Sequence, residues 1–452
     1  MLVAVSIAII LLVLGILVTG HELGHFWVAS WLKIKAFEVS IFVGPKLLQW
    51  KRKGVEYTIR AIPLGAYVRF SDFDEEGNVI QDDDPSLLIN QKRWKRLLVA
   101  LAGPFMNLIL GVVIMTIYSS VTFGMSMRTD TTIPYTQMYV AVQNNADYQD
   151  GDLITHVNGH RVFTYLDLTM EAEAFTNQND PVILTLKSQT SGESYELVVD
   201  PCLVERPMMG FIYSADAVEE GWLIEETYEN ANNGNPVLKS EDILVAIDGI
   251  SVFDESIEEF CYALKDGQTV TFTFIRNGEE HNEESIVNTL LVPEFVRKGI
   301  YLESFRVDSP ASFFRAFAES AKTPLSIGRI TGRVIQQAFK GNVEPYNVVQ
   351  GPVGLTASVT EVVGQQRVSI TEKIHDLILY SAIISLGLMY SNLLPIPGLD
   401  GNQIILILVE AVIGRPISRK AENVIAVVGF VLIVLLAVFA LASDIIRIFV
   451  GA

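Results

Sequence analysis

The chain has 452 residues, half of them hydrophobic, and a formal net charge of -19 at pH 7. This length leaves room for about three domains of ordinary size. High apolarity and strong acidity rarely belong to one compact soluble domain, so we expect the apolar and acidic residues to lie in different parts of the chain. The acidic excess also argues against a nucleic-acid partner, which a stripe of basic residues would attract.

Four stretches are apolar and long enough to cross a bilayer, which takes about 20 residues of helix. The first has no basic leader and no small-residue cleavage site, so we expect a span and not a removable signal peptide. The four stretches are Leu2–Gly20, Leu97–Tyr118, Leu377–Leu394 and Val424–Leu441. The sequence therefore predicts a polytopic α-helical membrane protein with four transmembrane helices.

Basic residues beside the spans predict the orientation, because cytoplasmic loops are enriched in lysine and arginine. They gather between the first two spans and again before the last span. The residues are Lys33, Lys35, Lys46, Lys51, Arg52, Lys53, Arg60, Arg69, Lys92, Arg93, Lys95 and Arg96, and then Arg415, Arg419 and Lys420. Both loops should be cytoplasmic, which places both termini and the acidic insert of residues 122–374 outside.

The motif HELGH follows directly on the first apolar run. On a helix, His21 and His25 lie on one face, so both imidazoles can reach one tetrahedral zinc. Glu22 stands next to them, where it can take a proton from an attacking water. The bland alternative is a cluster of histidines solvated at the membrane boundary. Ionisable groups in spans are expensive and usually functional, which favours a metal site.

Zinc in a catalytic site needs a third protein ligand. Asp400 follows the third apolar stretch within NLLPIPGLDG, at the cytoplasmic end where the topology also places HELGH. Pro395 and Pro397 break helical hydrogen bonds there, and Asn392 can bridge to the freed backbone or to an extended peptide. The alternative is a proline kink with a capping aspartate. Other histidines fall on the far side of the membrane in this topology, namely His156, His160, His281 and His375.

These two motifs together resemble the site-2 protease family of intramembrane zinc metalloproteases, in the bacterial regulator-of-sigma-E-protease-like branch with PDZ domains. The resemblance implies zinc ligands at His21, His25 and Asp400, a general base at Glu22 and a substrate-binding asparagine at Asn392. Two further segments look like family elements, Gly103-Pro104-x-x-Asn107 and Gly351–Gly354. Asn402 departs from the pattern, because many relatives have a second glycine after Gly401.

The segment Phe37–Phe70 alternates like strands and has a turn signal at KRKG, which predicts a hairpin. The resemblance implies a loop that dips toward the active site, where its free edge can pair with an unwound substrate. An ordinary cytoplasmic hairpin is the alternative.

One pattern occurs twice in the insert, at Asp150–Val162 and at Ser240–Val252. Each copy has an acidic residue before a strand and an N-G or D-G turn, and each resembles a bacterial PDZ domain, the first more closely than the second. Outside the membrane a tandem pair would suit a size filter for substrates, although two structural modules with closed grooves are the alternative. Cys202 and Cys261 could pair or remain buried thiols.

The predicted fold thus combines four transmembrane helices, a membrane-associated β-hairpin loop and an α+β tandem PDZ-like extracytoplasmic insert. The expected segments are helix 1 with HExxH (1–30), the cytoplasmic hairpin loop (31–96), helix 2 (97–121), two PDZ-like domains (122–205 and 206–300), an amphipathic helix and linker (301–374), helix 3 with the LDG motif (375–413) and a peripheral helix 4 (421–450).

The predicted function is a zinc metalloendopeptidase that cleaves transmembrane or signal-peptide-like segments near the cytoplasmic face of a bacterial inner or cytoplasmic membrane. Its expected partners are single-span membrane proteins or remnant signal peptides, together with membrane lipid. The alternative function is a non-catalytic PDZ-bearing membrane scaffold or sensor, which would be expected to lose Glu22 or Asp400. A zinc transporter would need a relay of ligands across the membrane, and the spans contain no second cluster of His, Asp or Glu.

Overall fold

The computed structural model describes residues 2–70, 84–129, 148–177, 180–199, 202–218, 221–228, 231–254, 256–294, 302–344, 346, 351–364 and 370–450. The chain divides into two compact units, each of which is described by itself. Unit 1 comprises Met1–Gly124, Arg306–Gly364 and Thr371–Ala452, and unit 2 comprises Met125–Phe305 and Gln365–Ile370.

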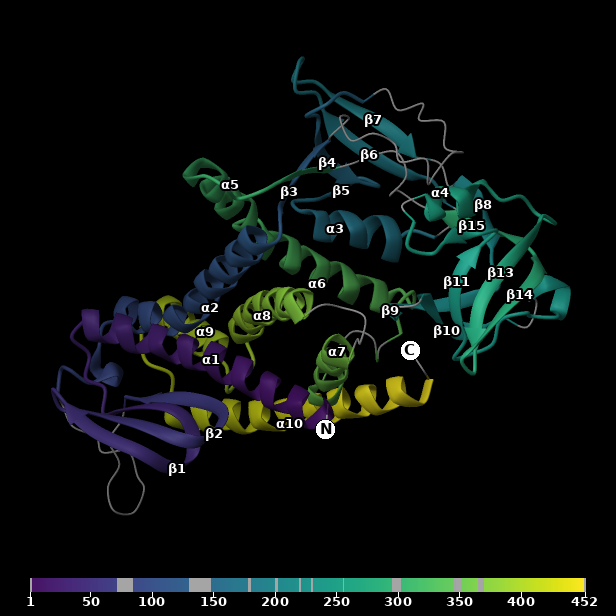
Figure 1. Ribbon diagram of the computed structural model, residues 1–452. Helices are drawn as coiled ribbons and strands as arrows, with labels where there is room; N and C mark the ends of the chain where they lie inside the picture. The colour runs from purple at the N-terminus through teal and green to yellow at the C-terminus, as the bar shows by residue number, and fades with distance from the viewer. Residues whose placement is uncertain are drawn as a thin grey trace. The chain divides into compact units, whose positions relative to one another are not determined.

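Unit 1 contains, within the described part of the chain, four helices long and apolar enough to cross a membrane, which confirms the predicted number of spans. They are α1 (Leu2–Trp31), α2 (Arg93–Val121), α8 (Ile370–Leu393) and the segment Val424–Arg447 of α10 (Arg419–Val450). Helices α1 and α2 lie side by side (Figure 1). The HELGH motif belongs to α1 itself, so its histidines project from a membrane helix.

The predicted hairpin is formed by β1 (Glu38–Arg52) and β2 (Val55–Arg69), which follow α1. Its turn has positive φ at Lys53 and Gly54, 51° and 83°. The hairpin is bent back on itself, since Val39 in β1 is opposite both Tyr57 and Val68 in β2. Residues 38–41 therefore lie between two segments of β2, and residues 66–69 form an outer strip, in which Val68 contacts Glu22 of α1. The hairpin as a whole lies beside α1 (Figure 1).

A buried carboxylate holds this bent hairpin together. Glu38 accepts hydrogen bonds from the Tyr67 hydroxyl (2.8 Å), the Arg60 guanidinium (3.0 Å) and the Thr58 hydroxyl (3.2 Å). Burial alone would raise the pKa of Glu38, but these hydrogen bonds outweigh it and lower the pKa below its ordinary value. The network connects both strands, so it fixes the position of the outer strip.

We expect Glu38→Gln to destabilise the hairpin by about 1–3 kcal/mol, because three donors lose their charged acceptor. Since the folded-state pKa of Glu38 is lowered, its contribution is complete above the unfolded pKa and is lost as the pH falls through the folded value. Hydrogen exchange of residues 38–69, corrected for intrinsic rates, measures this. Protection should differ between wild type and variant at pH 6, and the difference should vanish as the pH falls below the folded-state pKa of Glu38; a difference that persists unchanged through acid pH would contradict the role given to Glu38.

The predicted third transmembrane segment, 375–413, consists of two helices. Helix α8 ends at Leu393, and α9 (Asp400–Ile413) begins after the turn that contains Pro395 and Pro397. Proline has no N–H to continue the helix, which explains the break. Asp400 is therefore the first residue of a new helix.

Helix α10 is the least buried of the four candidate spans, as expected of a peripheral helix, but it contacts this turn. A Cβ atom on Gly429 would collide with Pro397, and one on Gly398 would come within 2.8 Å of the Ile433 side chain. Asp444 of α10, which is buried, accepts hydrogen bonds from the N–H groups of Gly351 and Val353 at the start of α7 (Pro352–Gly364). Helix α10 thus packs closely against the segment that presents Asp400.

Two further helices of unit 1 occupy the region where one amphipathic helix was expected, α5 (Pro310–Ser320) and α6 (Thr323–Phe339). Helix α5 contacts α2 and exposes Phe313, Phe314 and Phe317. Helix α6 is joined to α8 by the Tyr390 hydroxyl, which donates to the Pro324 carbonyl oxygen (2.7 Å).

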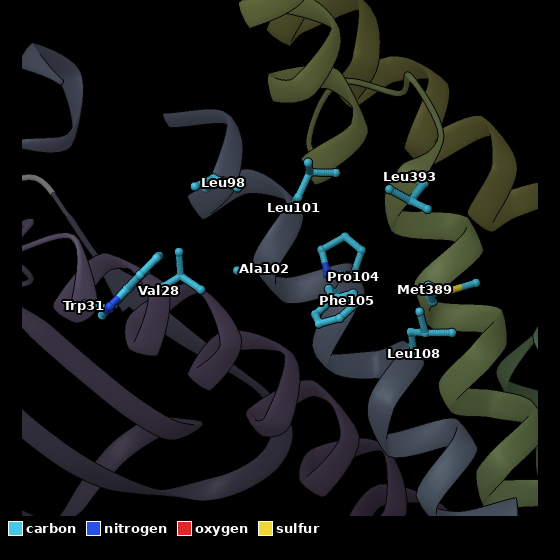
Figure 2. Close-up of a pocket in the computed structure, with 10 residues that line it drawn as sticks. All are labelled: Val28, Trp31, Leu98, Leu101, Ala102, Pro104, Phe105, Leu108, Met389 and Leu393. Atoms are coloured by element: carbon cyan, nitrogen blue, oxygen red, sulfur yellow. The ribbon is translucent and has the colours of Figure 1, made fainter. Parts of the chain in front are cut away.

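A pocket of about 400 Å³ opens between α1, α2 and α8 (Figure 2). Its lining is apolar and includes Trp31, Phe105 and Leu393, with no titratable side chain among the residues that line it. Such walls suit hydrocarbon and offer no groups for chemistry, so the site must be sought elsewhere.

Unit 2 contains two sheets that share one strand order. The first runs β16-β3-β4-β6-β7 and the second β9-β10-β11-β13-β14, with β5 and β12 as short additions to β4 and β11. The first uses β3 (Gly124–Thr129), β4 (Leu153–Val157), β5 (His160–Arg161), β6 (Val182–Lys187), β7 (Ser194–Val199), β16 (Leu302–Phe305) and α3 (Tyr165–Thr169). The second uses β9 (Phe211–Val218), β10 (Gly221–Thr227), β11 (Ile243–Ile247), β12 (Ile250–Ser251), β13 (Thr269–Arg276), β14 (Glu279–Ile286) and α4 (Ile257–Ala263).

The two sequence repeats form corresponding turns in these sheets. Asn158 and Asp248 have φ of 48°, and a glycine with positive φ follows each. The Asn158 side chain accepts from the N–H of Ile183, and Asp248 accepts from the N–H of Thr271. The internal repeat seen in the sequence is therefore also a repeat of structure.

The repeats are nested, not serial as the expected boundaries of 122–205 and 206–300 imply. Strand β16 follows the second repeat in the chain but pairs with β3 in the sheet of the first. The chain leaves and returns through a two-stranded ribbon of β8 (Cys202–Met208) and β15 (Asn288–Glu294). A strand that returns from so far along the chain carries no local sequence signal.

Candidate active site

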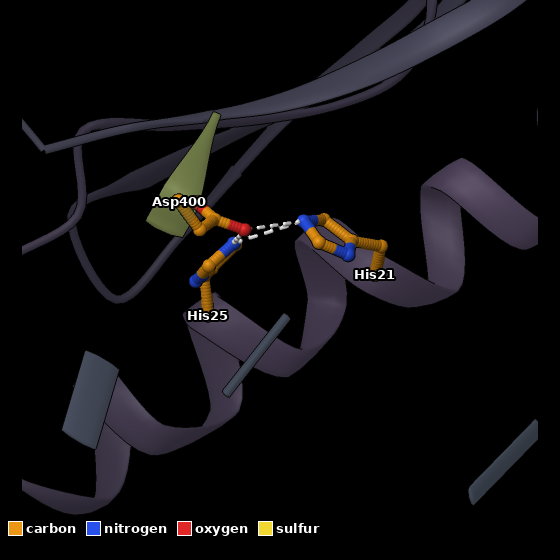
Figure 3. A group of neighbouring side chains, drawn as sticks. All are labelled: His21, His25 and Asp400. Carbon is orange, nitrogen blue, oxygen red and sulfur yellow. Dashed lines mark hydrogen bonds and ion pairs between the residues drawn. The ribbon is translucent and has the colours of Figure 1, made fainter. Parts of the chain in front are cut away.

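Three side chains from two helices meet at one point in unit 1. Among the described residues, His21, His25 and Asp400 form the group of potential metal ligands, with ligand atoms within 4.8 Å of one another. The Nε2 atoms of the histidines are 3.2 Å apart, and Oδ2 of Asp400 is 2.9 Å from His21 Nε2 and 3.3 Å from His25 Nε2 (Figure 3). The three side chains singled out from the sequence are thus brought together.

The surroundings of His25 determine which of its nitrogens carries the proton. Its Nδ1 atom is 2.7 Å from the carbonyl oxygen of Val99, which can only accept a hydrogen bond. Nδ1 therefore carries the hydrogen, and Nε2 has a free lone pair directed at the cluster. This arrangement of carbonyl, imidazole and ligand position is the usual support of a metal-binding histidine.

The geometry of the cluster fits zinc. Four ligands at about 2.0–2.2 Å in a tetrahedron lie roughly 3.3–3.6 Å from one another, so the three observed separations of 2.9, 3.2 and 3.3 Å need only a small opening to admit the ion. Oδ2 of Asp400 is buried, and the two imidazole nitrogens are its polar neighbours among the described residues. A cation bound by both imidazoles would satisfy this buried carboxylate oxygen as well.

Glu22 lies next to this cluster but outside it. Its carboxylate accepts a hydrogen bond from the backbone N–H of Val68 (3.2 Å) in the outer strip of the hairpin. Because Val68 is opposite Val39 and directs its N–H away from that partner, the free edge of the sheet faces Glu22. A proton acceptor and a strand edge are therefore adjacent.

Asn392 lies in the last turn of α8, before the turn that leads to Asp400. The side chain is half-buried, and no described residue forms a hydrogen bond with its amide. The structure places Asn392 on the segment that carries Asp400 and leaves its amide available to a ligand.

Helix α2 comes very close to the histidines at Gly103. A Cβ atom there would be 2.6 Å from His21 Nε2 and closer still to His25 Nε2. On the facing helix, a Cβ on Gly24 would be 2.5 Å from the carbonyl oxygen of Ala102. The glycines of HELGH and of the G-P-x-x-N element thus allow α1 and α2 to approach at the cluster.

Gly103→Ala should weaken zinc binding at least about tenfold, since the added methyl displaces both rings, and should cost about 1–3 kcal/mol of stability through overpacking. Gly387→Ala in α8 is a matched control, because nothing lies within 4 Å of its added Cβ. Zinc titration against a competing chelator measures both variants. Equal affinity in the two would contradict the close approach.

Sequence reasoning did not find the groups that support these side chains. Val99 contributes a main-chain carbonyl and Val68 a main-chain N–H. Every residue except proline carries both groups, so the identity of these residues could not reveal their roles. Asn107 lies 3.2 Å from His21 Nδ1, and its only signal was its place in the G-P-x-x-N element.

Comparison with known proteins agrees with this site. Residues 9–436 match the model of Peptidase family M50. A protein of Neisseria meningitidis named as a zinc metalloprotease is 26% identical over 457 residues, which cover 96% of this chain and 97% of the relative. Similarly named proteins of Pasteurella multocida and Clostridium acetobutylicum are 26% and 25% identical, each covering 98% of this chain and 99% and 97% of their own lengths.

The chain belongs to peptidase family M50, the site-2 protease family. It is a zinc metalloprotease of the membrane, which confirms the enzyme class and cofactor predicted from the sequence. The alternative of a non-catalytic scaffold is set aside.

Proposed function

We propose that the protein is an intramembrane endopeptidase that cleaves transmembrane or signal-peptide-like segments near the cytoplasmic face. The observation that carries this proposal is that the three clustered side chains meet at one place in unit 1, two of them from within a helix able to span a membrane. A site in such a helix reaches peptide bonds within lipid, which soluble proteases do not.

In this proposal His21, His25 and Asp400 hold the zinc. When bound, zinc polarises the scissile carbonyl and makes water a stronger acid. Glu22 takes the proton of the attacking water and passes it to the leaving amine, a role that its place beside His21 supports. Each imidazole would offer its Nε2 lone pair to the metal, with His25 held by the Val99 carbonyl.

The substrate must be extended at the scissile bond, because an intact helix shields its peptide groups. The free edge at Val68 supports binding of an extended segment by strand addition. Asn392 has an amide without a described partner and would hold the backbone of that segment from the other side. This is the proposed role of the hairpin as a membrane-associated loop.

The basic loops support an orientation with the hairpin in the cytoplasm and the nested repeats outside, in a bacterial inner or cytoplasmic membrane. We propose that the repeats are PDZ-like and admit substrates whose bulky external domains have been removed, such as single-span proteins or remnant signal peptides. Their shared strand order and corresponding turns support one domain type in two copies.

Purified protein in lipid vesicles, given a reporter with one transmembrane segment, tests this function. Mass spectrometry of the products should place the cut inside the apolar segment, near its cytoplasmic end. A zinc chelator should stop cleavage, and added zinc should restore it. Cleavage only in the soluble flanks of the reporter would contradict an intramembrane site.

A further inference from the structure

Helix α2 presents three residues, each one turn from the next, to the two histidines. The carbonyl oxygen of Val99 faces His25, and the side-chain amide of Asn107 faces His21. Gly103 lies between them and leaves room for both rings, because it has no side chain. The spacing i, i+4, i+8 places all three on one face of the helix. The role of Val99 is clear from its chemistry, whereas that of Asn107 depends on the protonation of His21.

The zinc site requires a lone pair on Nε2 of His21, since that atom faces His25 and Asp400. A neutral imidazole then carries its hydrogen on Nδ1, which must donate it. The amide of Asn107, 3.2 Å away, is the group that faces this nitrogen. Only the oxygen of that amide can accept the hydrogen bond.

The burial of Asn107 strengthens this requirement. The residue is completely buried, and its Oδ1 atom has no hydrogen-bond partner when Nδ2 is turned toward the ring. The two orientations of an amide differ only in which atom faces the partner. Turning Oδ1 toward the ring satisfies both that oxygen and the Nδ1–H group. The backbone at Asn107 is held by Ser385, whose hydroxyl donates to its carbonyl (2.9 Å).

We propose that Asn107 is a positioning residue of the zinc site, which accepts the Nδ1–H hydrogen bond of His21 and so fixes its tautomer and ring orientation. This inference rests on the proposed ligand set of His21, His25 and Asp400. It gives each histidine an oxygen acceptor from α2, a carbonyl for His25 and an amide for His21. Such outer partners commonly account for about 10–100-fold in metal affinity.

The test compares Asn107→Leu and Asn107→Ala, which remove the acceptor, with Asn107→Asp, which keeps an oxygen. Leucine preserves the volume of the side chain, so it carries the test if the alanine variant does not fold. Zinc affinity is measured by competition with a chelator, and the visible spectrum of the cobalt-substituted protein reports ligand geometry independently of activity. Thr116→Ala is the matched control, because the hydroxyl of this buried threonine of α2 donates to the Val112 carbonyl of its own helix and not to the cluster.

Asn107→Leu should bind zinc about 10–100-fold more weakly and show an altered cobalt spectrum, while Asn107→Asp should stay within a few-fold of wild type. Equal affinity and spectrum in wild type and Asn107→Leu would overturn the proposal, as would equal losses in the leucine and aspartate variants or in Thr116→Ala. His21→Ala separates the two levels of inference. If it leaves zinc affinity unchanged, the ligand set itself is wrong, whereas a loss there with none in Asn107→Leu refutes Asn107 alone.

Discussion

Replacing Glu22 by glutamine should reduce cleavage of a membrane-segment reporter by about 10²–10⁴-fold, because the amide cannot accept the proton of the attacking water. Zinc content should not change, since the Glu22 carboxylate faces Val68 and lies outside the cluster of ligands. The measurement pairs initial rates in lipid vesicles with metal analysis of the same preparation.

Glu22→Asp is the matched control for this result. It keeps a carboxylate but draws it back by one methylene, so it should retain part of the activity. Wild-type cleavage by Glu22→Gln would contradict the role of Glu22 as general base. Loss of zinc from Glu22→Gln would show instead that the carboxylate belongs to the metal site.

Removal of the Asp400 carboxylate should have the largest effect on zinc itself. Asp400→Ala leaves two imidazoles as protein ligands, and we expect zinc affinity to fall on the order of 100- to 1,000-fold. This estimate divides the binding free energy of a structural zinc site equally among its four ligands. Cleavage should be lost at ordinary zinc concentrations and recover in part when excess zinc is added.

A matched control for Asp400→Ala is Asp444→Ala, which removes another buried carboxylate of unit 1, one that caps α7. That variant should lose stability but keep its zinc affinity when folded. Equal zinc affinity in Asp400→Ala and wild type would contradict the ligand role of Asp400.

The membrane helices and the ligand cluster could be predicted from the sequence because both are determined by short stretches of residues. An apolar run of about 20 residues is typical of a transmembrane helix. His21 and His25 have helical spacing, and Asp400 follows two prolines that had to end a helix. The same prolines explain why the predicted segment 375–413 became α8 and α9.

The remaining features depend on long-range packing. The turn of the hairpin has a signal at Lys53 and Gly54, but its bend is fixed by Glu38, which draws together Arg60 and Tyr67 from the other strand. The contact between the fourth span and the turn before Asp400 joins Gly429, a glycine among many apolar residues, to Pro397. Neither pairing has a periodicity that could be read along the chain.

The central claim is that one zinc ion is held jointly by α1 and by the start of α9, and Asp400→Cys tests it most directly. X-ray absorption of this zinc-loaded variant should show one sulfur at about 2.3 Å together with two imidazole nitrogens, whereas wild type should show nitrogen and oxygen only. An identical ligand shell without sulfur in the variant would mean that residue 400 does not bind the metal, and would contradict the account.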